Sequence, residues 1–166
     1  MAQYRARSTR PPSPSWRSFL ANHVECLASI DFFVVPTFTF RLLYAFVVLC
    51  HQRRRVAHCN VTGHPAAQWI ARQLQEAFPF EEAPRYLIRD RDAACGERFH
   101  ECLERMGVEE VLIVPRSPWQ CPCVERLIGS IRRECLDHLI VFGEAHLQRV
   151  LGSYFPYYQT TRPPLA

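Results

Sequence analysis

Residues 26–61 read CLASIDFFVVPTFTFRLLYAFVVLCHQRRRVAHCNV and decide the fold. The stretch holds three apolar segments, at residues 26–35, 41–50 and 56–61, which contain many of the β-branched and aromatic residues that strands favour. A Pro-Thr pair separates the first two segments, and a basic turn separates the second from the third. We therefore expect three consecutive strands that pair as antiparallel hairpins.

The rest of the chain alternates between helical and strand-like patterns. After a Gly-His-Pro start, a helix is expected whose sheet-facing residues are Ala67, Ile70, Ala71, Leu74 and Phe78. The later elements are expected at 85–90 (strand), 97–106 (helix), 108–114 (strand), 115–122 (loop), 123–138 (helix) and 144–160 (helix). The helix at 97–106 would turn Phe99, Cys102, Leu103 and Met106 inward and end at Gly107 as its C-cap.

This order of elements predicts the topology. Helical crossovers require the fourth and fifth strands to run parallel to their neighbours, whereas the first three strands are joined by short turns. The sequence therefore predicts an α/β domain with a mixed five-stranded sheet flanked by helices.

Composition indicates one globular domain with a basic arm. The chain has 166 residues, of which 48% are hydrophobic and 12% aromatic, and its net charge is +4. Every one of the 20 basic residues is an arginine, the residue that binds phosphate bidentately, although coding bias in a GC-rich genome would also remove lysine. No acid precedes Glu25, while the first segment carries Arg5, Arg7, Arg10 and Arg17. We expect residues 1–23 to be a basic arm or severed linker and residues 24–166 to form the domain.

Eight cysteines raise the question of disulfides and zinc. No signal peptide is recognisable, so we expect a cytoplasmic address with reduced cysteines. The tightest cluster of possible zinc ligands is Cys121, Cys123, Cys135 and His138. The single residue between the first two is poor spacing for a zinc site. The apolar stretch at 32–50 is interrupted by proline, threonines and an arginine, so no membrane span is expected.

Three acids lie within apolar elements or at their ends, and the functional hypothesis rests on them. Asp31 is the only charge in the first strand, Asp90 ends the fourth, and Glu125 lies on the expected helix VERLIGSIRREC. Phosphoryl transfer through two divalent cations needs carboxylates that converge from rigid elements. Magnesium keeps several waters and is held by few protein oxygens, so two or three acids suffice. The trio predicts a metal-dependent site that acts on phosphodiesters.

Each acid also has a structural interpretation. Asp31 would be explained by a hydrogen bond to a turn, but the apolar run continues beyond it and an unpaired charge within a strand is costly. Asp90 competes with Asp92, because arginines beside them would form a surface ion-pair cluster. Glu125 alone would be a solvated helix acid.

The helix that carries Glu125 adds to the functional interpretation. Gly129, Arg132 and Arg133 follow at i+4, i+7 and i+8, which places them on the same helix face. A glycine beside the acid leaves room for a backbone phosphate, and the arginines would bind that phosphate.

From about residue 27 to 164 the chain resembles the catalytic core of bacterial insertion-sequence transposases and retroviral-type integrases, the DDE family with a ribonuclease H-like fold. The motifs that carry the resemblance are SIDFF, YLIRDRDAACGERF, VPRSPWQCPCVERLIGSIRRECLDH and YFPYYQTTRPP. The resemblance implies Asp31 and Asp90 as the first two catalytic aspartates and Glu125 as the closing glutamate. It implies that all three bind Mg²⁺ or Mn²⁺, with Asp92 as the alternative to Asp90.

The resemblance also implies partners and an address. Water would first cleave a DNA strand at an element end, and a DNA 3′-hydroxyl would then attack the target phosphodiester. The residues expected to contact DNA are Arg116, Trp119, Gln120, Arg126, Arg132 and Arg133. The active form would be a homo-oligomer without membrane contact, in a bacterial cytoplasm and associated with the nucleoid.

The chain departs from the family pattern in three places. Cys121-Pro122-Cys123 replaces the usual Asn before V-E, and Gln159 and Pro164 replace Asn and His in the closing segment. The glycine that usually follows the second aspartate comes only at Gly96. Family members also carry an N-terminal helix-turn-helix, which nothing before Trp16 could form, so a separate DNA-recognition subunit is one expectation. The alternatives are a truncated, catalytically silent DNA-binding or oligomerising remnant and a nonspecific ribonuclease H-like nuclease.

Overall fold

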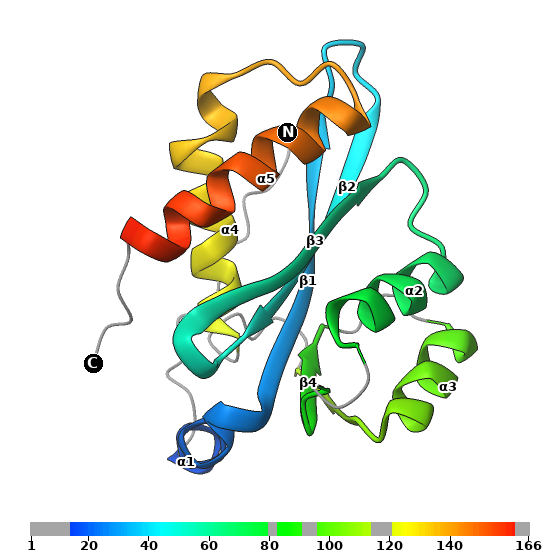
Figure 1. The fold of residues 1–166 in the computed structure, drawn as a ribbon, viewed down its shortest axis with the longest axis vertical. Helices are drawn as coiled ribbons and strands as arrows, with labels where there is room; N and C mark the ends of the chain where they lie inside the picture. Colours follow the sequence, from blue (N-terminus) through cyan, green and yellow to red (C-terminus); the bar gives the residue numbers. More distant parts are fainter. Residues whose placement is uncertain (1–13, 80–82, 91–95, 114–120, 162–166) are drawn as a thin grey trace, which may run out of the picture.

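The computed structural model describes residues 14–79, 83–90, 96–113 and 121–161. A five-stranded sheet in the order β3-β2-β1-β4-β5 lies at the centre, with helices on both faces (Figure 1). The strands are β1 (Leu27–Pro36), β2 (Leu42–Cys50), β3 (Arg55–Thr62), β4 (Tyr86–Arg89) and β5 (Glu109–Leu112). The helices are α1 (Pro14–His23), α2 (Ala67–Ala77), α3 (Glu97–Met106), α4 (Pro122–Glu134) and α5 (Glu144–Thr161), with short 3₁₀ turns η1 (Val24–Cys26), η2 (Gln52–Arg54) and η4 (Leu136–His138).

The sheet is mixed, as predicted. β1 pairs with β2 and β2 with β3 in antiparallel fashion, whereas β1 pairs with β4 and β4 with β5 in parallel. The connections explain the difference: hairpin turns join the first three strands, and α2 and α3 form the crossovers before β4 and β5. The α/β fold class predicted from the sequence is confirmed.

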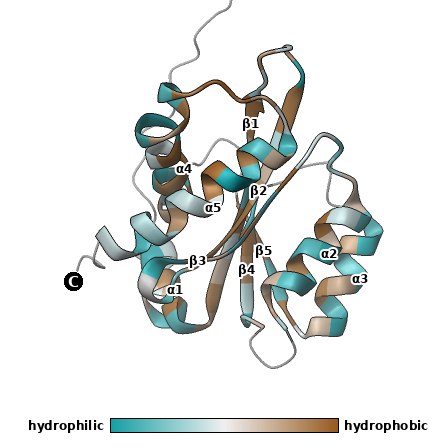
Figure 2. Ribbon diagram, turned by 45° about the horizontal axis from the view of Figure 1, so that its top comes forward, coloured by the Kyte–Doolittle hydropathy of each residue, from teal (hydrophilic) through white to brown (hydrophobic). Residues whose placement is uncertain are grey.

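Side chains of β1 alternate between two hydrophobic cores. Leu27, Phe33 and Val35 belong to the core under α4 and α5, while Ala28 and Ile30 belong to the core under α2 and α3. In Figure 2 the central strands are mostly hydrophobic, and the surrounding helices alternate between hydrophobic and hydrophilic residues. Because β1 is covered on both faces, it reads as a nearly continuous apolar run.

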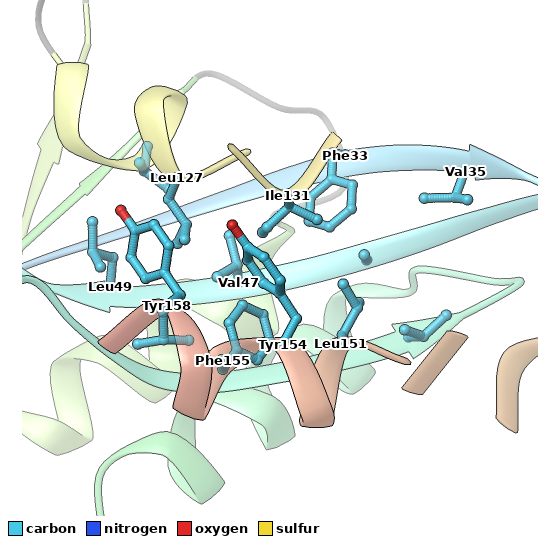
Figure 3. Close-up of a cluster of buried hydrophobic side chains, with 14 of the residues drawn as sticks. Phe33, Val35, Val47, Leu49, Leu127, Ile131, Leu151, Tyr154, Phe155 and Tyr158 are labelled. Atoms are coloured by element: carbon cyan, nitrogen blue, oxygen red, sulfur yellow. The ribbon is translucent and has the colours of Figure 1, made fainter. Parts of the chain in front are cut away.

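Helices α4 and α5 cover the core that contains Leu27, Phe33 and Val35. Leu127 and Ile131 of α4 and Tyr154 and Tyr158 of α5 point at Val47 and its neighbours in the sheet (Figure 3). Burial of each such side chain contributes about 1.5–3 kcal/mol. This packing fixes α4 against the face of the sheet to which Asp31 belongs.

The described structure refines several expected elements. The helix expected at 123–138 stops at Glu134, because Cys135 leaves helical geometry and the chain continues as η4. Residues 14–23 form helix α1. In α2, Ile70 and Leu74 are buried as predicted, and in α3 Gly107 is the left-handed C-cap with φ of 66°.

Two alanines of α2 do not face the sheet. Ala67 and Ala71 are only half-buried, and both lie toward α3. A Cβ on Gly96 would lie 3.3 Å from that of Ala67, and the Cys102 thiol donates to the carbonyl oxygen of Ala71 at 3.6 Å. Small residues here allow the two helices to approach closely, so the expectation that these alanines face the sheet was wrong for a packing reason.

Candidate active site

Asp31 lies in the middle of β1, opposite Val47 of β2, and is half-buried. Its position in the strand is in phase with Leu27 and Phe33, so it belongs to the face covered by α4 and α5. The backbone N–H of Phe32 donates to Asp31 Oδ1 at 2.7 Å. The backbone of its own strand therefore helps to hold the carboxylate.

Asp90 directly follows β4, which runs parallel to β1, and is exposed. The register pairs Ser29 with Ile88, and continuing it by two residues aligns Asp31 with Asp90. Neighbouring strands lie roughly 5 Å apart, and Asp90 is in phase with Ile88 of the α4-facing core. The topology thus brings two sequence-predicted acids to the same level of adjacent strands.

The start of α4 lies beside Asp31. Burial raises the pKa of the Cys121 thiol to about 12, a hydrogen bond with Ser29 opposes this rise, and the nearby Asp31 and Cys123 add to it. Cys121 is the N-cap residue of α4, and its carbonyl accepts from the N–H of Glu125 at 3.3 Å. Glu125 therefore lies one helical turn after Cys121, which contacts Ser29 of β1 and lies near Asp31.

Glu125 lies in the first turn of α4 and is half-buried. Val124 and Leu127 are 1% and 0% exposed, so the residues that flank Glu125 press this turn against the sheet. A carboxylate in the first turn is also favoured by the helix dipole.

A buried polar pair supports this region, and sequence reasoning missed it. Ser29 Oγ and His51 Nε2 lie 2.5 Å apart, and the two residues are 0% and 7% exposed. Burial, together with repulsion from Arg54, lowers the pKa of His51 to about 4, so the ring is neutral at pH 7. With Cys121, the pair links the end of β2, the middle of β1 and the start of α4. The only indication of this pair in the sequence is Ser29 itself, a serine within an apolar strand.

Arg89 fixes the backbone that leads to Asp90. It is 6% exposed, forms an ion pair with Glu110 of β5, and lies over the ring of Phe99 at 5.4 Å. Its guanidinium also donates to the carbonyl oxygen of Asp90 at 2.9 Å. The expectation of a surface ion-pair cluster is therefore wrong for Arg89, because this arginine is buried and pairs across the sheet. Asp92 lies outside the described residues, so the choice between Asp90 and Asp92 stays open.

The predicted DNA-contacting arginines of α4 are exposed. Arg126, Arg132 and Arg133 all present their side chains at the surface. Arg133 Nη1 lies 3.2 Å from the position a Cβ on Gly129 would take, so its guanidinium covers the space beside this glycine. Arg116, Trp119 and Gln120 fall within residues 114–120, which lie outside the described part of the chain.

The donor atoms of the three acids fit a hard cation. Mg²⁺ and Mn²⁺ prefer carboxylate oxygens, whereas the neighbouring Cys121 stays protonated and is a poor ligand. Among the described residues, no three or more His, Cys, Asp or Glu side chains are grouped closely enough to hold one ion. This applies to Asp31, Asp90 and Glu125 as they stand, and also to the cysteine cluster at the ends of α4. None of the helices in the described ranges is long and apolar enough to cross a membrane.

Comparisons with known proteins agree with the fold. Residues 106–164 match the sequence model of a family described as integrase core domain, a segment that contains Glu125 but neither aspartate. Among solved structures, a chain of the simian T-cell lymphotropic virus intasome in complex with PP2A regulatory subunit B56 gamma is 14% identical with a TM-score of 0.64. That match covers 76% of this chain and 47% of the other, so this chain spans about half of its length. No curated protein sequence matches the chain.

Two further similar structures are of the HTLV-2 integrase catalytic core domain in complex with magnesium. The trimeric form is 13% identical with a TM-score of 0.54, covering 65% of this chain and 67% of that one. The dimeric form is 13% identical with a TM-score of 0.53, covering 65% and 68%. The sheet order and these similarities show a ribonuclease H-like fold of the integrase core type.

Proposed function

We propose that this chain is the catalytic core of a DNA recombinase of the integrase and transposase family, of the bacterial insertion-sequence type. The observation that carries the proposal is that α4 begins beside Asp31 and presents Glu125 one turn later. The parallel register of β1 and β4 supports the addition of Asp90 to the same edge. Acids from three separate elements then serve one site, as two-metal phosphoryl transfer requires.

Asp31, Asp90 and Glu125 would hold the cation. The HTLV-2 core domain of the same fold has been solved with magnesium, which supports Mg²⁺ here, with Mn²⁺ as an alternative. When bound, the metal supplies positive charge that activates the attacking oxygen and stabilises the leaving one. The three acidic side chains must move closer together to bind the cation. Ser29, His51 and Arg89 would hold the backbones of Asp31 and Asp90 in place during this movement.

The arginines of α4 would bind the DNA backbone. Arg126, Arg132 and Arg133 are exposed on the helix that carries Glu125, and guanidinium groups bind phosphate bidentately. We propose that Arg116, Trp119 and Gln120 contact DNA from the preceding loop. Element ends and target DNA are the proposed partners, the active form would be an oligomer, and a separate subunit would supply end recognition. The proposed place of action is the nucleoid of a bacterial cytoplasm. Residues 24–166 are the proposed core and residues 1–23 the proposed basic arm, but the α1 part of that arm packs against the core through Trp16, Phe19 and Leu20.

The test is metal-dependent nicking and joining of DNA, measured on supercoiled plasmid and on DNA that flanks the gene. We expect cleavage with Mg²⁺ or Mn²⁺ and a loss of at least about 100-fold in Asp31→Asn and Glu125→Gln. Comparison of Asp90→Asn with Asp92→Asn identifies the second aspartate. Glu104→Gln, on α3 at the opposite face, is the control and should cleave normally.

The outcomes separate the alternatives. A folded chain that binds DNA but never cleaves it would be the silent remnant, and the catalytic proposal would be wrong. Cleavage restricted to the RNA strand of an RNA–DNA hybrid would indicate a ribonuclease H-like nuclease instead.

A further inference from the structure

The tip of the β1–β2 hairpin exposes phenylalanine side chains to solvent. Phe38 and Phe40 are 57% and 90% exposed, and Ile140 and Phe142 of the segment before α5 are 65% and 63% exposed. We call these four residues the aromatic tip. Monomeric proteins expose single apolar side chains often, whereas an exposed group of several such side chains is often an interaction site.

The two halves of the aromatic tip are joined. The N–H of Phe38 donates to the carbonyl oxygen of Val141 at 2.9 Å, and the rings of Phe38 and Phe142 lie 5.5 Å apart. Phe142 also contacts the ring of His146 at 5.3 Å. Figure 1 shows the hairpin reaching past the rest of the sheet beside the segment that leads into α5. The aromatic tip is therefore one surface held by a backbone hydrogen bond.

The ring of Phe40 is almost fully exposed in a single copy, and only the backbone of this residue takes part in the turn. Its φ of 61° is left-handed, a conformation that costs free energy for a bulky residue and suits glycine or asparagine. Thr37 already builds the turn, since its carbonyl oxygen accepts from Phe40 N–H at 2.9 Å and its backbone N–H donates to Arg41 at 2.8 Å. The ring itself stays in water.

The chemistry of the surface indicates what covers it. Arg41 is the only charged residue in residues 37–42 and 139–143, all of which the structure describes, so the surface lacks the several cations that nucleic acid needs. An uncharged aromatic surface complements another copy of itself, because ring packs against ring without any requirement for charge matching.

The area fits a dimer. At roughly 200 Å² for each fully exposed aromatic side chain, the aromatic tip presents about 500 Å² of apolar surface. One side of a standard interface buries about 800 Å², of which about 65% is apolar in homodimers. We propose that the aromatic tip is the centre of a two-fold interface between two copies of this chain, with Phe40 as its main contact. The interface does not depend on whether the chain cleaves DNA.

Sedimentation velocity over about 1–100 μM chain tests this proposal. We expect the full chain to shift from monomer to dimer with rising concentration, and Phe40→Asn to raise the dimer dissociation constant by about tenfold or more. The same variant should unfold at an equal or higher temperature, because asparagine tolerates the left-handed turn. Tyr157→Asn removes another exposed aromatic ring, 56% exposed on α5 and outside the aromatic tip, and should leave association unchanged.

Three results would overturn the proposal. The chain could remain monomeric throughout this range, or it could dimerise equally well with Phe40→Asn, which would place the interface elsewhere. A monomeric chain whose DNA affinity falls in Phe40→Asn would assign the aromatic tip to nucleic acid. Because none of these measurements uses cleavage, their outcome is independent of the proposed catalytic activity.

Discussion

Ser29 and His51 show how a single buried residue pair shapes the surroundings of Asp31. The histidine is neutral because burial and Arg54 lower its pKa to about 4, against an ordinary value of 6.5. A neutral ring is able to share a proton with the serine hydroxyl, while a charged ring at this position would lack compensation. The pair thus makes the interior of the site sensitive to acid.

The pH dependence of stability tests this assignment. The unfolded chain protonates His51 near pH 6.5 and the folded chain only near pH 4, so stability is fully present above pH 6.5 and is lost as the pH falls towards 4. The loss over this window amounts to about 3 kcal/mol. Urea unfolding from pH 7 downwards should show it, and His51→Gln should lack this part of the slope.

The control for this measurement is His64→Gln, which alters an exposed histidine. It should keep the full pH dependence of the parent chain. Equal slopes in His51→Gln and the parent chain would show that His51 is not buried in the neutral form.

Individual site residues differ in how far the sequence reveals them. The strand positions of Asp31 and Asp90 were predictable, because Asp31 is the only charge within one apolar strand and Asp90 directly ends another. Ser29 and His51 were not predictable, because they are 22 positions apart and meet only through the β1–β2 pairing. Arg89 pairs with Glu110 of β5, and nothing in the sequence near residue 89 indicates this partner. The burial of Arg89 was therefore not predictable either.

At the scale of elements, helix ends provide a measurable contrast. Gly107 ends α3 with φ of 66°, where a Cβ is strained even though nothing lies within 4 Å of it. Gly152 lies within α5 with open space around its Cβ position. The left-handed conformation at position 107 requires a glycine, whereas Gly152 weakens the helix in which it lies.

We therefore expect opposite effects from the same substitution. Gly107→Ala should reduce the free energy of unfolding by about 1 kcal/mol, while Gly152→Ala should raise it by about 0.5–1 kcal/mol. Urea denaturation of the two variants beside the parent chain measures both. Equal effects in the two variants would contradict the assigned helix ends.

The spacing of apolar residues predicted most helices and strands, because in each element these residues face a single core. It failed where another constraint operated. Ala67 and Ala71 follow helical spacing yet face α3, since close helix packing requires small residues, and the break after Glu134 has no glycine or proline to mark it. β5 (Glu109–Leu112) is shorter than the strand expected at 108–114, of which Val114 lies outside the described residues.

At the scale of the whole molecule, the sheet order explains why the elements that carry the three distant acids are neighbours. β1 lies at the centre with β4 beside it, and α4 packs across the face of the sheet to which residues 31 and 90 belong. The mixed topology was predictable from the order of elements, because hairpins and helical crossovers permit few arrangements. The positions of side chains on that face were not, since they depend on how α4 packs.

The exposed arginines of α4 should dominate the salt dependence of DNA binding. Arg132→Ala and Arg133→Ala should each weaken binding and reduce the slope of log affinity against log salt by about one. Fluorescence anisotropy across a salt series measures both quantities. Arg72→Ala, on α2 at the opposite face, is the matched control and should leave the slope unchanged. An equal loss in all three variants would indicate diffuse attraction without a defined face.

The most direct test of the central claim is a crystal structure of the chain grown with Mn²⁺, with the ion located by its anomalous scattering. The account predicts one or two manganese peaks, about 3.5–4 Å apart if two, bound by carboxylate oxygens of Asp31, Glu125 and either Asp90 or Asp92. A peak held by other residues, or a metal ion bound by Asp31 without Glu125, would contradict this central claim.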